Sequence, residues 1–256
     1  MTITTKPVTR YAVDVQPDSQ IPPIWREASW PVEWLSLRTS AVYHGWGVPR
    51  GDGSAVIVIP GFMSGDAFMY EMFAWLGRIG YKPYLSGISV NAGCPGQTAE
   101  KLIKVAERAY METGRKVRIV GHSLGGLLGR HLALKRPDLV AQVVYMGSPI
   151  RAVHAHPAVV MTAGALGGLR SMMSSGRRCV ASGCDCGLTA ESTMRMPASV
   201  RHAAIYTRFD GVVDWQDALE RDRRRNFEVG GSHVGLVFNP RAYKVLSQLL
   251  AQTPVA

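Results

Sequence analysis

The hexapeptide GHSLGG at residues 121–126 constrains the fold more than any other part of this chain. It follows the apolar run at residues 117–120 and opens a helical pattern that continues through Leu127 and Leu128. Glycine is the residue that fits a turn so sharp that other side chains would collide with the neighbouring strand and helix. We therefore expect a buried strand, a strained turn that exposes the side chain of Ser123, and a helix that begins directly after it.

Short apolar runs alternate with helical patterns along the rest of the chain. The predicted strands are residues 55–59, 82–85, 117–120, 142–146, 202–208 and 226–229. Helices are predicted at residues 66–79, with Asp66 as the N-cap, at residues 98–113, and from Pro240 onward. This alternation favours an α/β fold in which a mostly parallel sheet is covered by helices on both faces.

Two segments depart from the alternation. Residues 1–50 are rich in proline and tryptophan, which predicts an N-terminal arm that lays aromatic side chains on the core, with a short helix near residues 34–43. Residues 150–200 are too long for a plain connection between two strands, which predicts an inserted cap. Residues 51–149 and 201–256 then form the core domain.

Within the cap, glycine and methionine are frequent between residues 158 and 176. This content suits a mobile lid over an apolar pocket, because methionine fills irregular gaps and glycine allows hinge motion. A helix that is packed permanently on the core is the alternative.

The composition limits the class of protein. A chain of 256 residues with 46% apolar content is long enough for one large α/β domain. We find no run of about 18 apolar residues that predicts a membrane span, and the first residues lack the pattern of an export signal. The expected location is therefore the cytoplasm, and a secreted protein whose signal has been removed is the alternative.

The net charge of +10 raises the question of an anionic partner. The basic residues are spread along the chain, and the densest cluster, at residues 221–225, has no aromatic residues between the arginines that could stack on bases. A solvated surface is the favoured interpretation, and no nucleic-acid partner is expected.

Ser123 needs partners if it is to act as a nucleophile, because a serine hydroxyl reacts poorly at neutral pH without a base and a group that orients the base. His233 is the predicted base, since it follows the last predicted strand in a glycine-rich loop. Asp210 is the predicted acid, because it comes directly after a strand and before Gly211. Asp214 is the second candidate, although it could instead cap a following helix.

Acyl transfer also requires N–H donors that stabilise a negatively charged oxygen. The amide of Leu124 directly follows Ser123. Gly61, in the loop after the strand at residues 55–59, leaves the amide of Phe62 able to turn toward the same site. A Pro-Gly turn that merely ends this strand is the alternative interpretation.

Three other histidines are given structural roles. His122 lies next to Ser123 on the turn and is expected to pack or to form a hydrogen bond. His154 and His156 have the spacing of a metal-ligand pair, but suitable carboxylates or cysteines are not close by in the sequence, so ordinary surface histidines are favoured.

The chain has four cysteines, Cys94, Cys179, Cys184 and Cys186, and the last three fall in the predicted cap. A zinc site built on them lacks a convincing fourth ligand. One disulfide within the cap is favoured, with free thiols or a long-range bond to Cys94 as alternatives, and the pairing is left open. Such a bond would indicate an oxidising compartment.

Four short motifs together resemble those of the α/β-hydrolase superfamily, and specifically of small bacterial lipases and esterases. They are PGF at residues 60–62, GHSLGG at 121–126, DGVV at 210–213 and SHVG at 232–235. The resemblance extends over roughly residues 52–250, and the order serine, acid, histidine agrees with that superfamily.

The resemblance implies a role for each predicted site residue. Ser123 would be the nucleophile, His233 the general base and acid, Asp210 its orienting carboxylate, and the amides of Phe62 and Leu124 the oxyanion hole. It implies no metal and no organic cofactor.

The implied activity is that of a serine carboxylester hydrolase, which cleaves small-molecule or lipid esters through an acyl-enzyme and makes transient contact with a lipid surface. An acyltransferase or a thioesterase with the same triad is the alternative. A binding module without enzymatic activity is the third hypothesis.

Overall fold

A single parallel sheet organises the protein. The computed structural model describes residues 21–173 and 194–252. Within them, six strands are arranged in the order β2-β1-β3-β4-β5-β6, and every neighbouring pair is parallel. The strands are β1 (Ala55–Ile59), β2 (Lys82–Leu85), β3 (Val117–His122), β4 (Val140–Met146), β5 (Arg201–Tyr206) and β6 (Asn226–Glu228). All six predicted strands are present, with ends that differ by at most two residues.

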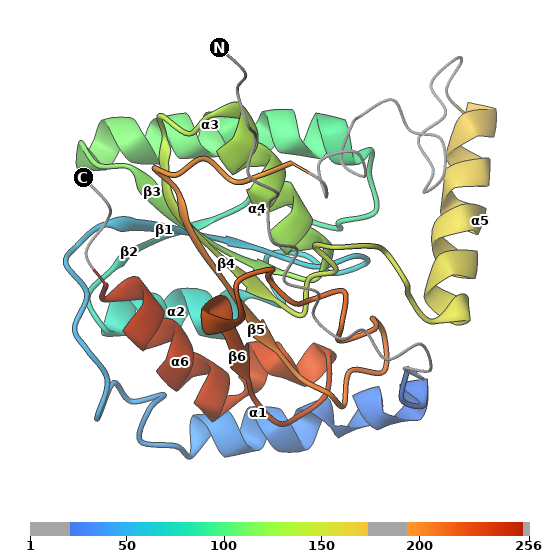
Figure 1. Cartoon of the computed structure of the whole chain (residues 1–256), viewed down its shortest axis with the longest axis horizontal. Helices are drawn as coiled ribbons and strands as arrows, with labels where there is room; N and C mark the ends of the chain where they lie inside the picture. Colours follow the sequence, from blue (N-terminus) through green and yellow to red (C-terminus); the bar gives the residue numbers. More distant parts are fainter. Residues whose placement is uncertain (1–20, 174–193, 253–256) are drawn as a thin grey trace, which may run out of the picture.

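Helices cover both faces of this sheet (Figure 1). On one face lie α2 (Tyr70–Arg78) and α6 (Pro240–Leu250), and on the other lie α3 (Pro95–Thr113) and α4 (Leu124–Lys135). Each pair of helices closes a separate hydrophobic cluster over the sheet. β1, β3 and β4 are buried on both faces, so none of them alternates between apolar and polar residues. β1 is a continuous apolar run, whereas β3 and β4 also contain the buried polar residues Arg118 and Gln142. The predicted α/β architecture is confirmed.

Three predicted helix starts are wrong, one of them that of the helix expected near residues 34–43, which is found at Trp30–Arg38. The carboxylate of Asp66 does not cap α2, which begins at Tyr70. It accepts hydrogen bonds instead from the amides of Ser86 and Gly87, in the loop after β2. Helix α3 begins at Pro95 rather than at Thr98, because proline fits the first turn of a helix, where its missing N–H has no partner to lose.

The described part of the N-terminal region consists of a 3₁₀ helix, η1 (Ile24–Ser29), followed by α1 (Trp30–Arg38). The expectation that its tryptophans cover the core is wrong for Trp25 and Trp46, which are 73% and 70% exposed. The buried anchors of this region are Leu37, Tyr43 and Glu27. An aliphatic, a phenolic and a carboxylate group therefore hold the segment in place.

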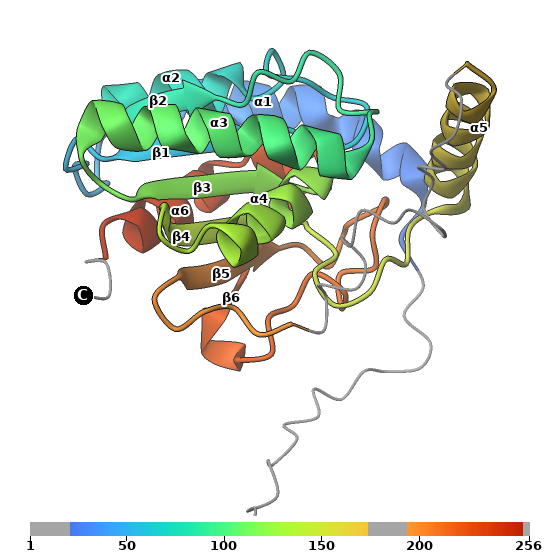
Figure 2. The same cartoon turned by 90° about the horizontal axis from the view of Figure 1, so that it is seen from above.

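Helix α5 (Pro157–Met173) lies within the predicted cap and stands apart from the two helix layers in both views (Figures 1 and 2). The residues before it are tied to the loop after β5, because Ala155 and Val213 form an antiparallel bridge. Two of its apolar side chains, Val160 and Met161, are exposed. Cys179, Cys184 and Cys186 lie outside the described residues, so the predicted cap disulfide concerns a part of the chain that the structure does not describe.

None of the helices in the described ranges combines the length and the apolar character needed to cross a membrane.

Candidate active site

Ser123 occupies a strained turn between β3 and α4. Its φ of 51° lies in the left-handed region, where non-glycine residues are uncommon. The neighbouring glycines are required by close packing: a Cβ on Gly121 would lie 2.4 Å from the carbonyl oxygen of Gly125, and a Cβ on Gly125 would lie 2.2 Å from that of Ile59. The strand, sharp turn and helix predicted from the sequence are therefore present, but the expected exposure of Ser123 is wrong, because this residue is only 8% exposed.

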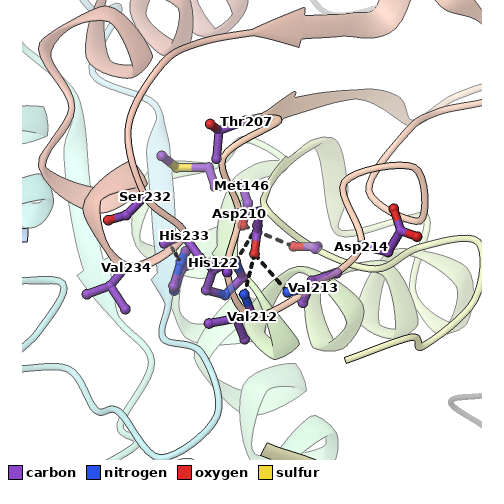
Figure 3. Close-up of polar contacts among 12 residues, drawn as sticks. His122, Met146, Thr207, Asp210, Val212, Val213, Asp214, Ser232, His233 and Val234 are labelled. Atoms are coloured by element: carbon purple, nitrogen blue, oxygen red, sulfur yellow. Dashed lines mark hydrogen bonds and ion pairs between the residues drawn. The ribbon is translucent and has the colours of Figure 1, made fainter. Parts of the chain in front are cut away.

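His233 and Asp210 face one another beyond the carboxyl ends of β6 and β5 (Figure 3). The distance from His233 Nδ1 to Asp210 Oδ2 is 2.6 Å, and both side chains are buried. The second carboxylate oxygen of Asp210 accepts the amides of Val212 and Val213 at 2.9 and 2.8 Å. These two amides fix the carboxylate so that one oxygen remains directed at the imidazole.

Asp214, the second candidate for the acid, lies farther along the same loop and points away from His233 (Figure 3). Its Oδ1 accepts the amide of Gln216 at 2.9 Å, which is a local turn contact. The geometry therefore brings Asp210, and not Asp214, to the histidine.

The end of β4 links the turn of Ser123 to His233. The amide of Ser123 donates to the carbonyl of Met146 at 2.8 Å, and the next residue, Gly147, packs against the imidazole. A Cβ on Gly147 would lie 3.1 Å from His233 Nδ1. Among the described residues, no hydrogen bond joins Ser123 Oγ to the ring, and in enzymes without substrate such contacts are often long and shorten on binding.

The side chain of His122 forms a hydrogen bond with the backbone of His233. The Nε2 of His122 lies 2.9 Å from the carbonyl oxygen of His233, so this nitrogen donates the hydrogen bond and Nδ1 is left without a proton. The Nδ1 atom is buried and has no hydrogen-bond partner. Burial, followed by the nearby charge of His233, lowers the pKa of His122 to about 3. The ring is therefore neutral, and the predicted hydrogen-bonding role of His122 is confirmed.

The surroundings of His233 raise its pKa, in contrast to those of His122. Burial alone lowers the pKa of this imidazole, but the negative charge and hydrogen bond of Asp210, together with the charge of Glu27, raise it above the ordinary value. The proton on Nδ1 is held by Asp210, which leaves the lone pair on Nε2 as the basic position. An imidazolium formed there is stabilised by the two carboxylates.

We expect the stability of the protein to fall in mild acid because of His122. Its pKa is lower in the folded protein than the ordinary value of 6.5, so protons favour the unfolded chain, and the stability present above pH 6.5 is lost as the pH falls. Between about pH 6 and 4.5, above the range in which most carboxylates titrate, the free energy of unfolding should decline with a slope approaching about 1.4 kcal/mol per pH unit.

Chemical denaturation at a series of pH values measures this slope. The variant His122→Gln keeps an amide that can donate to the carbonyl of His233 but does not titrate, so its profile should be flatter over the same range. An equal slope in the variant would contradict the assignment. His233 does not produce this effect, because its raised pKa makes its contribution constant below about pH 6 and lost only at higher pH.

The loop after β1 lies directly beside Ser123. A Cβ on Gly61 would lie 3.0 Å from the Cβ of Ser123, so this loop can approach only because residue 61 is glycine. Within the part of the chain that the structure describes, neither the amide of Phe62 nor that of Leu124 donates to another backbone carbonyl. Both amides thus lack a backbone acceptor among the described residues, and their role as oxyanion donors stays a prediction.

Asn91 holds this loop, a role that the sequence did not predict. It is buried, its side-chain amide donates to the carbonyl of Pro60 at 2.8 Å, and its own carbonyl accepts the amide of Met63 at 3.0 Å. The only sequence signal was an asparagine beside a glycine-rich stretch, which usually indicates an ordinary turn.

Glu27 was also missed, although it contacts both loops of the site. Its Oε1 accepts the amides of Gly211 and His233, and its Oε2 accepts the amide of Val234. A glutamate in a segment rich in tryptophan and proline has no local pattern that indicates such contacts.

His154, in front of α5, makes an ion-pair contact with the loop after β5. The side chain of His154 is largely exposed, and its Nδ1 lies 2.8 Å from Asp217 Oδ2. Across the described ranges, no group of three or more side chains has the arrangement of a metal site.

Comparison with known proteins supports the fold assignment. A family model described as "alpha/beta hydrolase fold" matches residues 99–168. Triacylglycerol lipases from Pseudarthrobacter phenanthrenivorans and Burkholderia plantarii are each 35% identical over 106 residues, which is 38% of this chain and 33% and 29% of theirs. A homoserine O-acetyltransferase from Deinococcus radiodurans is 28% identical over 133 residues, 43% of this chain and 38% of that protein. The chain thus matches about a third of the length of these relatives.

Solved structures extend the likeness to most of the chain. A lipase from Bacillus licheniformis is similar with a TM-score of 0.59 and 15% identity, over 80% of this chain and 94% of that one. A monoglyceride lipase from Saccharomyces cerevisiae has a TM-score of 0.56 and 12% identity, over 83% and 90%. At such identities the likeness concerns the fold. Taken with the strand order and the match of the family model to residues 99–168, it shows that the chain has the α/β-hydrolase fold.

Proposed function

We propose that this protein hydrolyses carboxylic esters through a covalent acyl-enzyme, with Ser123 as nucleophile, His233 as base and Asp210 as the carboxylate that orients it. The observation that carries the proposal is the 2.6 Å contact between His233 Nδ1 and Asp210 Oδ2. Gly147, which packs against this histidine, directly follows the residue that accepts the amide of Ser123 on its strained turn. A nucleophile next to a base that is itself oriented by a third group is the arrangement that acyl transfer requires.

The reaction proceeds in two steps. The hydroxyl of Ser123 attacks the ester carbonyl and its proton passes to Nε2 of His233, while the amides of Phe62 and Leu124 donate to the oxygen that becomes negative. His233 then protonates the departing alcohol, leaving an acylated serine. Water, deprotonated by the same imidazole, releases the carboxylic acid and restores the hydroxyl.

We infer that the substrates are lipid esters with medium or long acyl chains. The two relatives with 35% identity are triacylglycerol lipases. Helix α5 supports the same choice, because exposed apolar side chains such as Val160 and Met161 suit contact with a lipid surface or an acyl chain. The bridge between Ala155 and Val213 puts the start of this helix next to the loop of Asp210.

An acyltransferase is the second candidate, and the specific observation in its favour is the similarity to the homoserine O-acetyltransferase. The same serine, histidine and aspartate would form the acyl-enzyme. The difference lies in the second step, in which an alcohol rather than water takes the acyl group.

A series of p-nitrophenyl esters from acetate to palmitate tests both candidates. We expect release of p-nitrophenol together with the free carboxylic acid, and a kcat/KM that is higher for medium or long acyl chains than for acetate. Addition of glycerol or homoserine should leave the free acid as the main product. Transfer of the acyl group to the added alcohol would favour the acyltransferase, and the absence of turnover with every ester would contradict hydrolysis.

A further inference from the structure

The carboxylate of Glu27 joins the two loops that carry the proposed acid and base. Its Oε1 accepts the amide of Gly211 at 2.9 Å and the amide of His233 at 3.1 Å. Its Oε2 accepts the amide of Val234 at 2.7 Å. Gly211 directly follows Asp210, so a single side chain holds the residue after the acid and the histidine itself. Glu27 is 9% exposed, and three N–H donors around one carboxylate offset the cost of its burial.

The fit between Glu27 and these loops is close. A Cβ on Gly211 would lie 3.0 Å from Glu27 Oε1, so glycine leaves the room that the carboxylate uses. His233 is thus held at three points: at its amide by Glu27, at its carbonyl by His122, and at Nδ1 by Asp210. A base held in this way loses little orientational freedom when it takes a proton.

Glu27 also acts on His233 through its charge. The titratable groups that face the imidazole are Asp210 from the loop after β5, His122 from β3, and Glu27 from η1. His122 is neutral, so Glu27 supplies the second negative charge that favours the imidazolium, after Asp210. Positive charge develops on the histidine when Ser123 attacks, and a fixed negative charge beside it lowers the energy of that state.

Glu33 provides an internal comparison from the same N-terminal segment. It accepts the amide of Ser232 at 3.0 Å, so it also contacts the histidine loop through the backbone. Unlike Glu27, it does not contribute to the raised pKa of His233. Both glutamates therefore bind the N-terminal segment to the histidine loop, but only Glu27 raises the pKa of His233.

We propose that Glu27 is a positioning residue for the reaction: it sets the separation of the Asp210 and His233 loops and places a second negative charge beside the imidazole. The proposal rests on the function proposed above, because it assigns His233 as the base. It also makes the N-terminal segment, which lies outside the residues matched by the family model, part of the machinery of the site.

Glu27→Gln tests this proposal, because the substitution keeps the shape of the side chain and removes the charge. One amide of the cluster then faces an NH₂ group instead of an oxygen. We expect kcat for a p-nitrophenyl ester to fall by about 10²-fold, the cost typical of a small misplacement, while KM changes much less. We also expect the acid limb of the kcat/KM profile to move to lower pH, because the lost charge lowers the pKa of His233.

Two further variants separate positioning from stability. Glu33→Gln removes the neighbouring carboxylate and is expected to lower thermal stability without moving the acid limb. Glu27→Asp keeps the charge with a shorter reach, so the limb should return toward its original position while kcat recovers only in part; this variant also serves if Glu27→Gln does not fold. An unmoved limb in Glu27→Gln, or an equal movement in Glu33→Gln, would overturn the proposal.

An NMR titration of His233 shows whether the role proposed for Glu27 or the proposed ester hydrolysis is wrong. The ring signals of His233 report its pKa whether or not any ester is turned over. A lower pKa in Glu27→Gln with no hydrolysis by the wild-type protein would reject the proposed reaction and retain the contact between Glu27 and the histidine. Hydrolysis by the wild type with an unchanged titration and unchanged kcat in the variant would reject the role of Glu27 alone.

Discussion

Replacement of Ser123 by alanine is expected to lower kcat for p-nitrophenyl ester hydrolysis by about 10⁴-fold or more, because no other group in the site can form the acyl-enzyme. The fold should be unaffected. Alanine meets the same backbone strain at a φ of 51° as serine does, and the Ser123 hydroxyl makes no hydrogen bond with another described residue. Steady-state kinetics and thermal unfolding of the same preparation measure the two effects separately.

His233→Ala should cost about as much as Ser123→Ala, and the double variant should be little worse than either, since the nucleophile and its base act as a unit. A fluorophosphonate probe gives an independent measurement: the wild-type protein is labelled and Ser123→Ala is not. Ser199→Ala is a matched control, because this exposed serine precedes β5 at the opposite edge of the sheet. Labelling or turnover that persists in Ser123→Ala would contradict the proposed mechanism.

The fold was predictable from the sequence because its signals are local. A strand buried on both faces, such as β1, favours an uninterrupted apolar run, and that run is visible without any knowledge of the partners. The turn around Ser123 is local in the same sense, since Gly121 and Gly125 are required by contacts within the strand, turn and helix and with the adjoining strand.

Asp66 shows where local reasoning fails. Its position before a helical pattern satisfies the N-cap rule, yet its carboxylate reaches the amides of Ser86 and Gly87 instead. These groups are 20 and 21 residues away in the sequence, and nothing in the pattern around Asp66 indicates that the loop after β2 will lie within reach. The hydrogen-bond partners of a polar side chain are therefore set by the tertiary structure and not by its local sequence alone.

The same distinction applies to the site. Asp210 and His233 could be proposed from the sequence because each lies in a short loop after the carboxyl end of a strand, and parallel strands end at one edge of the sheet. Glu27 could not be proposed, because its partners Gly211 and His233 are 184 and 206 residues away. The topology of the sheet sets the positions of the proposed reacting residues. The positions of the residues that support them depend on how segments far apart in the sequence pack together.

Replacement of Asp210 by asparagine is expected to lower kcat by about 10⁴-fold with little change in KM, and the hydrogen bonds of this carboxylate explain why. One of its oxygens accepts the amides of Val212 and Val213, so asparagine will keep its carbonyl oxygen there. The NH₂ group then faces His233 Nδ1, which must become an acceptor. The ring proton moves to Nε2, and an imidazole protonated at Nε2 cannot take the proton of Ser123.

Asp214→Asn is the matched control for this prediction, since it makes the same chemical change four residues away. Its Oδ1 accepts the amide of Gln216, a bond that asparagine can also form, so kcat should change by less than about threefold on the scale of a surface substitution. In the Asp210 variant, residual activity should have its acid limb at lower pH, because the carboxylate that raises the pKa of His233 is gone. If Asp214→Asn were instead the inactive variant, the loop after β5 would have to rearrange when substrate binds, and the acid would be Asp214.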